Sequence, residues 1–205
     1  MAGSKIIKRN AGAPVTAKQV KQMLVSRVEH KIAASTTNTI SWSASGVVSL
    51  LSTDIAQGDN IGNRSGDSIR PLRLTIRVSS TVTTGAAPII TRFIVFQDTM
   101  ANGSTPLVTD VLQTADYLSP YSPVTLQAKR FKILCDQYGT NVDGGSNKVT
   151  EVTKSFKMKG VVQYLSGSSG AAAAGKNSIY VLFINDFTAV NSIYKWSYQL
   201  EYMDA

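Results

Sequence analysis

Histidine and cysteine, the side chains that most often carry catalysis or bind transition metals, occur once each in this chain, as His30 and Cys135. A hydrolase triad would have to be built around His30, and a zinc site needs several Cys or His ligands. A single cysteine forms no intrachain disulfide, so Cys135 is interpreted as a small apolar residue buried in a strand. No G-x-x-x-x-G-K-[ST] or G-x-G-x-x-G phosphate-binding motif is present. The sequence therefore predicts a protein that is not an enzyme.

Positive charge is the second chemical signal, and it is concentrated at the start of the chain. The net charge is +8. Residues 1–31 contribute +6 of it, from one acid, Glu29, and seven bases: Lys5, Lys8, Arg9, Lys18, Lys21, Arg27 and Lys31. A nearly neutral body with a basic extension is the layout of a nucleic-acid-binding arm. A solubilising tail or a nuclear-import signal has the same charge, so charge alone leaves these alternatives open.

Periodicity indicates the element that positions these bases. Residues 1–14 lack an apolar pattern, and we expect them to be disordered without a ligand. Thr16 and Gln19 have the spacing of a capping box, and apolar residues from Val20 to Val28 recur at helical intervals. The sequence predicts a helix over about residues 16–30, within an arm that spans residues 1–31. Such a helix is marginal alone and needs a surface for its apolar stripe or phosphates for its lysines.

From residue 38 onward the composition becomes that of a β-sheet, with alternating apolar and polar residues between turn-rich loops. Seven or eight strands are predicted, in the segments 39–51, 72–79, 89–97, 130–136, 152–162, 179–185 and 194–203. One helix is predicted within 106–117, and the alanine run 171–174 is predicted to be a loop. Without a βαβ rhythm, this pattern predicts an all-β fold, an eight-stranded jelly-roll sandwich, as one shell domain over residues 32–205. No apolar run reaches the ~20 residues of a membrane helix, so no membrane contact is expected.

Four segments resemble the satellite tobacco necrosis virus coat protein family, and more loosely the jelly-roll capsid proteins of small circular single-stranded DNA viruses. They are QMLVSRVEHK (22–31), QGDNIGNRSGDSIR (57–70), RFIVFQDTMANGSTPLVTDVLQTADYLSPYSPVTLQAKRFKIL (92–134) and SYQLEYMDA (197–205). The family pattern has arginines where Gln22 and Gln97 stand here. The resemblance implies a virion protein, assembled in the host cell, that forms the smallest icosahedral (T=1) shell from copies of itself. It also implies an N-terminal helix that projects toward packaged RNA.

The resemblance implies two sets of site residues. Its inward-facing RNA contacts correspond to Lys18, Lys21, Arg70 and Lys129, which join the arm bases Lys5, Lys8, Arg9 and Arg27. Its calcium ions lie between subunits, with acidic ligands corresponding to Glu29, Asp59 and Asp204 and carbonyl oxygens near Ser65 and Ser68. Such oxygens are the hard ligands that Ca²⁺ prefers. The alternative is that Glu29 pairs with a lysine, Asp59 is a turn residue and Asp204 is a terminal acid.

Three functions follow, in order of preference. The first is a viral coat protein that packages single-stranded nucleic acid, with RNA as the first choice and the genome of a circular single-stranded DNA virus as the alternative. The second is a cellular single-stranded nucleic-acid-binding β-domain, although no dense aromatic stacking face is apparent. The third is a lectin-like or cupin-like jelly roll, and the missing histidines argue against a cupin metal site. Candidate shell contacts are the aromatic residues Trp42, Tyr117, Tyr121 and Tyr138, with core packing as the alternative.

Overall fold

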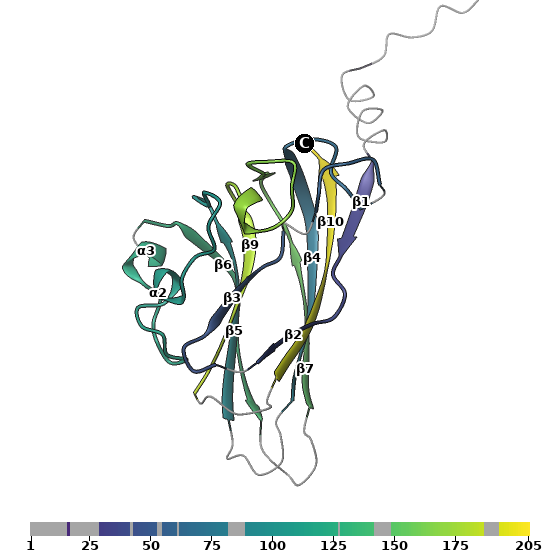
Figure 1. The fold of residues 1–205 in the computed structure, drawn as a ribbon. Helices are drawn as coiled ribbons and strands as arrows, with labels where there is room; N and C mark the ends of the chain where they lie inside the picture. The colour runs from purple at the N-terminus through teal and green to yellow at the C-terminus, as the bar shows by residue number, and fades with distance from the viewer. Residues whose placement is uncertain are drawn as a thin grey trace, which may run out of the picture.

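Two antiparallel sheets lie face to face in the computed structural model (Figure 1). The structure describes residues 16, 29–41, 43–52, 55–60, 62–81, 89–126, 128–141, 149–186 and 193–205. The first sheet has the order β1 (His30–Ala34), β10 (Ile193–Asp204), β4 (Ser68–Thr81) and β7 (Val149–Lys157). The second sheet has the order β3 (Val47–Leu50), β9 (Ser178–Asn185), β5 (Ile89–Asp98) and β6 (Phe131–Asn141). Two short strands, β2 (Asn38–Ser41) and β8 (Val162–Gln163), pair with β10 and β4.

The strand order is that of a jelly roll. The first and last long strands, β1 and β10, are neighbours, and β4 separates β10 from β7. In the second sheet β9 lies between β3 and β5. If the short strands β2 and β8 are set aside, strands that are consecutive in sequence therefore alternate between the sheets, except for the β5–β6 pair, which gives the two Greek keys of this fold. The prediction of an all-β jelly-roll sandwich is confirmed.

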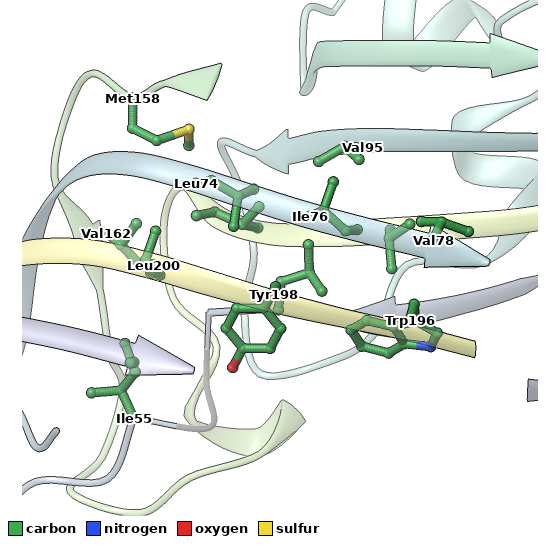
Figure 2. Packing of buried hydrophobic residues seen from close by; sticks show 14 of the residues in the cluster. Ile55, Leu74, Ile76, Val78, Val95, Met158, Val162, Trp196, Tyr198 and Leu200 are labelled. Carbon is green, nitrogen blue, oxygen red and sulfur yellow. The ribbon is translucent and has the colours of Figure 1, made fainter. Parts of the chain in front are cut away.

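The main core lies between the sheets and follows from the alternation along β10. Tyr194, Trp196, Tyr198 and Leu200 are buried, whereas the residues between them point outward. Figure 2 shows Trp196, Tyr198 and Leu200 beside the inward side chains of the neighbouring strand β4. Burying a large apolar side chain contributes about 1.5–3 kcal/mol, so this one face is a main source of stability. The alternation seen in the sequence is therefore the alternation of the core.

A second apolar cluster covers the outward face of the second sheet. The insertion between β5 and β6 carries two short helices, α2 (Val108–Val111) and α3 (Pro123–Leu126), which lie beside this sheet (Figure 1). Val111 and Leu112 of the insertion pack with residues of β5, β6 and β9. As a result β5 and β9 are buried on both faces, which explains their continuous apolar runs. The described residues provide no comparable cover for the outward face of the first sheet.

Several predicted elements differ from the observed ones. The helix predicted within 106–117 is the single turn α2, and α3 was not predicted. The strand predicted over 152–162 ends at Lys157, because Gly160 adopts a φ of 91° before the chain turns into β8. The alanine run forms the 3₁₀ turn η1 (Ala171–Ala173), since alanine favours helical turns over open loops.

The helix predicted over residues 16–30 lies outside the described residues except at its ends. His30 belongs to β1 and is paired with Met203, so the prediction that the helix extends to residue 30 is wrong. The alternating burial of residues 30–34 fits a strand, because Lys31 and Ala33 point inward. The last two residues of the predicted arm therefore lie in the first sheet. No helix in the described part of the chain is long and apolar enough to cross a membrane.

Candidate functional site

Part of the predicted calcium-ligand set meets where the first and last strands pair. The β1–β10 register brings Glu29 and Asp204 to the same end of the first sheet. The ammonium group of Lys31, only 5% exposed, lies there with its Nζ 2.8 Å from Asp204 Oδ2 and 3.7 Å from Glu29 Oε2. Nζ also donates to the Asn63 carbonyl at 2.9 Å and to the Ser65 hydroxyl at 3.1 Å. A lysine ammonium is thus the cation that the chain itself places at the centre of this cluster.

The Lys31–Asp204 pair ties the C-terminal strand to the loop before β4. Asp204 accepts hydrogen bonds from the backbone N–H of Ser65 at 3.1 Å and from its hydroxyl at 2.8 Å. Burial raises the pKa of Asp204, but the hydrogen bonds from Lys31 and Ser65 outweigh it, so this pKa lies below its ordinary value. The hydrogen bond to Asp204 raises the pKa of Lys31 by more than burial lowers it. Both groups are therefore charged at neutral pH.

The other two predicted calcium ligands are placed differently. The hydroxyl of Ser68 donates to the carbonyl of Ala205 at 3.0 Å. Asp59 is exposed and lines a hollow of about 490 Å³ with Ser65 and Gln57. Within the described residues, no three His, Cys, Asp or Glu side chains gather as a metal site. The described side chains of one subunit therefore do not by themselves form a complete calcium site.

Arg64 organises this loop and is a functional residue that was not predicted from the sequence. Its side chain is fully buried, and its guanidinium donates to the carbonyls of Ile55 at 3.2 Å, Gly66 and Ser166. The guanidinium carbon also lies 4.1 Å from the centre of the Tyr164 ring. An arginine in a Gly- and Ser-rich loop is usually exposed, so the sequence contains no signal for this role. Arg64 holds the loop that presents Asp59, Ser65 and Ser68.

The expected nucleic-acid contacts divide into two groups. Arg70 on β4 and Lys129 before β6 are both exposed, and no described contact joins them. Lys129 has a φ of 52°, in the left-handed region. The remaining expected contacts lie outside the described residues: Lys5, Lys8, Arg9, Lys18, Lys21 and Arg27. Because β1 begins at His30, the arm joins the body at the edge of the first sheet.

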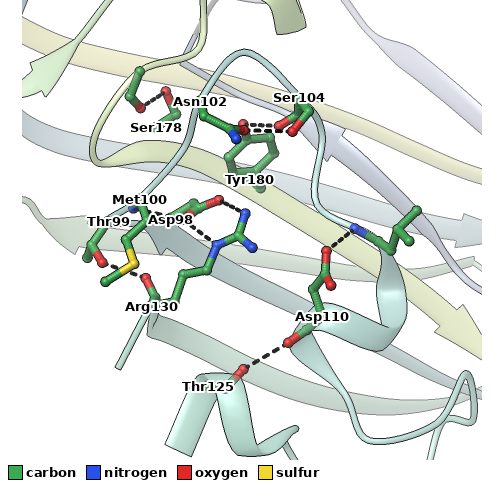
Figure 3. A network of polar contacts seen from close by, with 12 residues as sticks. Asp98, Thr99, Met100, Asn102, Ser104, Asp110, Thr125, Arg130, Ser178 and Tyr180 are labelled. Atoms are coloured by element: carbon green, nitrogen blue, oxygen red, sulfur yellow. Dashed lines mark hydrogen bonds and ion pairs between the residues drawn. The ribbon is translucent and has the colours of Figure 1, made fainter. Parts of the chain in front are cut away.

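A buried ion pair anchors the insertion that covers the second sheet. Asp98, which has no exposed surface, accepts hydrogen bonds from Arg130 Nε at 3.0 Å and Nη2 at 2.8 Å (Figure 3). It also accepts the backbone N–H of Met100 at 2.9 Å. The pair joins the end of β5 to the residue before β6. Gln97, where the family pattern has an arginine, is buried beside Asp98 and takes no part in this pair.

The candidate shell aromatics have mixed surroundings. Tyr121 donates to Asp136 at 2.6 Å, and the same carboxylate binds the buried guanidinium of Arg92 at 2.6 and 2.9 Å. Tyr117 and Tyr121 pack against the second apolar cluster, which is the core-packing alternative. Tyr138 is 44% exposed and remains a candidate contact. Trp42 lies outside the described residues.

Comparison with known proteins gives a consistent result over the whole chain. The family model described as satellite tobacco necrosis virus coat protein matches residues 4–205. The capsid protein of Satellite tobacco necrosis virus 1 is 35% identical over 197 residues, which cover 96% of this chain and 97% of that protein. The coat protein of Satellite tobacco necrosis virus 2 is 36% identical over 169 residues, 82% of this chain and 83% of that protein. The coat protein of Maize white line mosaic Satellite virus is 29% identical over 204 residues, 97% of this chain and 94% of that protein. The chain therefore belongs to the satellite tobacco necrosis virus coat protein family, whose members are structural proteins of the virion rather than enzymes.

Proposed function

We propose that this coat protein assembles with copies of itself into a small T=1 icosahedral shell and packages single-stranded RNA through its N-terminal arm. The observation that carries the proposal is the uneven charge: residues 1–31 provide +6 of the net charge of +8. The arm is close to β1 in sequence, and β1 is the strand at one edge of the first sheet. A charged arm on a nearly neutral shell domain separates nucleic-acid binding from shell building.

The energetics of such an arm suit packaging. Each phosphate contact with a single strand contributes about −0.7 to the slope of log K against log salt. Contacts to phosphates carry little sequence information, so any strand of the genome can be bound. Many arms in one shell raise the effective affinity far above that of one arm. Packaging therefore requires no sequence-specific site on the subunit.

The test is a chain that lacks residues 1–28. Because β1 starts at His30, this deletion keeps every described strand, and we expect the protein to fold and to form particles without nucleic acid. The measurement is the ratio of absorbance at 260 and 280 nm for purified particles. A matched control keeps the arm but replaces its bases with glutamine, which removes charge without shortening the chain. Filled particles from either variant would contradict the role of the arm, and nuclease digestion of wild-type contents separates RNA from the alternative, single-stranded DNA.

We also propose that calcium binds between copies of the subunit, with Glu29, Asp59 and Asp204 and the carbonyl oxygens of Ser65 and Ser68 as candidate ligands. Two observations support this proposal. Glu29 is 68% exposed and Asp59 is also exposed, so both can face a neighbouring subunit. Lys31 neutralises only one of the two acids next to it, Glu29 and Asp204, which leaves a negative charge for a cation at an interface.

The calcium proposal is tested by calorimetric titration of assembled particles with Ca²⁺ after chelation. We expect Glu29→Gln and Asp59→Asn each to weaken binding and to lower the thermal stability of the particle in calcium. Glu151→Gln is the matched control, because it removes an exposed carboxylate far along the sheet from this loop. Unchanged binding in the first two variants, or equal loss in all three, would refute this ligand set.

A further inference from the structure

The outward face of the first sheet is polar and positively charged. Along β4, β7 and β10 the inward positions are apolar or aromatic except for Ser80 and Lys154, and the outward positions carry charged residues together with serine, threonine and glutamine. The charged outward residues between the register rows of Arg73 and Ser79 are four bases, Arg73, Arg77, Lys157 and Lys195, and two acids, Glu151 and Glu201. This face therefore has an excess of positive charge in a body that is close to neutral overall.

The four bases form two pairs, and each pair lines a hollow in the sheet surface. Arg77 and Lys195 line a hollow of about 220 Å³. Arg73 and Lys157 line a hollow of about 550 Å³. The wall of each hollow also contains one glutamate, so two bases meet one acid and each hollow keeps a positive charge. Both hollows are open to solvent and have basic side chains in their walls, which suits an extended anionic ligand better than a small enclosed one.

The bases are poorly neutralised by the protein itself. Arg73 and Lys157 stand directly opposite each other on β4 and β7, an arrangement that is destabilising for like charges. The nearest opposite charge is Glu201, 3.9 Å from Arg73, and the two side chains are 61% and 41% exposed, so the pair is weak. Arg77, Lys157 and Lys195 form no ion pair with any described residue. A bound anion would remove this repulsion.

The rest of the face indicates which anion fits. The aromatic side chains of β10 point into the core, and no aromatic residue occupies an outward position of β4, β7 or β10. Nucleobases therefore have no aromatic side chain to stack on at this face. The serine and threonine hydroxyls between the charges can donate to phosphate oxygens. The outward face of the second sheet is covered by the insertion, whereas this face is bare and extends from β1, the strand that the arm joins.

We propose that the outward face of the first sheet is a second nucleic-acid contact, which binds the phosphates of a single strand through Arg77 and Lys195 in one hollow and Arg73 and Lys157 in the other. This inference rests on the packaging function proposed above and adds a surface on the folded body to the arm. Binding is independent of sequence, because only phosphates are contacted. Arg70, exposed on the same strand β4, continues the row of bases toward the arm end of the sheet.

The test compares two double variants of the full chain with equal charge change. Arg77→Gln with Lys195→Gln removes the bases of one hollow, and Lys132→Gln with Lys176→Gln removes two exposed bases outside the first sheet. The probe is a fluorescently labelled oligouridylate, and its affinity is measured by anisotropy over a series of salt concentrations. We expect the salt slope of the first variant to fall by about 1.4, from the loss of two phosphate contacts, and that of the second to stay at the wild-type value. Equal melting temperatures show that both variants are folded.

The outcomes separate this inference from the packaging proposal. Equal slopes in the two double variants overturn the sheet contact but leave packaging by the arm intact. A full chain that does not bind the oligouridylate at all overturns both. In the chain lacking residues 1–28, weak binding that disappears with Arg77→Gln and Lys195→Gln gives further support, since only the folded body remains there.

Discussion

Removing one or the other member of the Lys31–Asp204 pair has unequal consequences. In Asp204→Ala, the Lys31 ammonium stays buried and keeps two neutral acceptors, the Asn63 carbonyl and the Ser65 hydroxyl, and the exposed Glu29 carboxylate 3.7 Å away. In Lys31→Met, Asp204 keeps both hydrogen bonds from Ser65 and is 28% exposed to water. Removing one partner of a buried ion pair costs about 3–5 kcal/mol, and the remaining, exposed Glu29 carboxylate together with the solvent near residue 204 puts the first variant at the lower limit, near 3 kcal/mol. The second variant loses about 1 kcal/mol, as for a net hydrogen bond.

Urea unfolding of dispersed subunits, followed by tryptophan fluorescence, measures both losses. For a chain of this length, 3 kcal/mol corresponds to a fall of about 6–12 °C in melting temperature, against about 2–4 °C for 1 kcal/mol. The double variant, Lys31→Met with Asp204→Ala, has no buried ammonium group left without its partner. It is therefore expected to be more stable than Asp204→Ala alone. Equal losses in the two single variants would refute the reasoning, as would a double variant no more stable than Asp204→Ala.

The pH dependence of the same pair has a definite sign. Because the pKa of Asp204 is lowered by folding, its contribution is present above the ordinary value of about 3.9 and is lost as the pH falls through the lower folded value. Because the pKa of Lys31 is raised, its contribution is present below about 10.4 and is lost as the pH rises through the higher folded value. Asp204→Ala should therefore reduce the loss of unfolding free energy that wild type shows at acid pH. An unchanged dependence of this free energy on pH would contradict the lowered pKa of Asp204.

Two further predictions concern buried guanidinium groups. Arg130→Met should lower the free energy of unfolding in urea by about 3 kcal/mol, because the fully buried Asp98 carboxylate then keeps only the hydrogen bond from the Met100 N–H. The control Lys132→Met, at an exposed lysine, should change this free energy by no more than about 0.5 kcal/mol. Similar losses in the two variants would argue against a stabilising Arg130–Asp98 pair. Arg64→Met leaves three carbonyls without a donor, so limited proteolysis should cut the loop before β4 faster than in wild type, and an unchanged cleavage rate would show that Arg64 does not hold it.

The jelly roll was largely predictable because the pattern of apolar residues along each strand shows which of its faces are buried. β10 alternates aromatic and polar residues since one face of the first sheet is bare, and β5 and β9 are continuously apolar since the insertion covers the second sheet. The separation of a basic arm from a nearly neutral body is also a property of sequence alone. The extent of α2 was less predictable, because a single turn leaves little periodicity to detect.

What only the tertiary structure decided is which distant residues meet. In sequence, Lys31 belongs to a basic arm, but pairing of β1 with β10 places it against Asp204, far along the chain, and makes it the buried cation of that cluster. The role of Arg64 and the excess charge on the outward face of the first sheet arise in the same way, from loop and strand neighbours. Local patterns encode which side of a strand is buried, because burial acts on each residue separately. They do not encode strand partners, because pairing depends on the path of the whole chain.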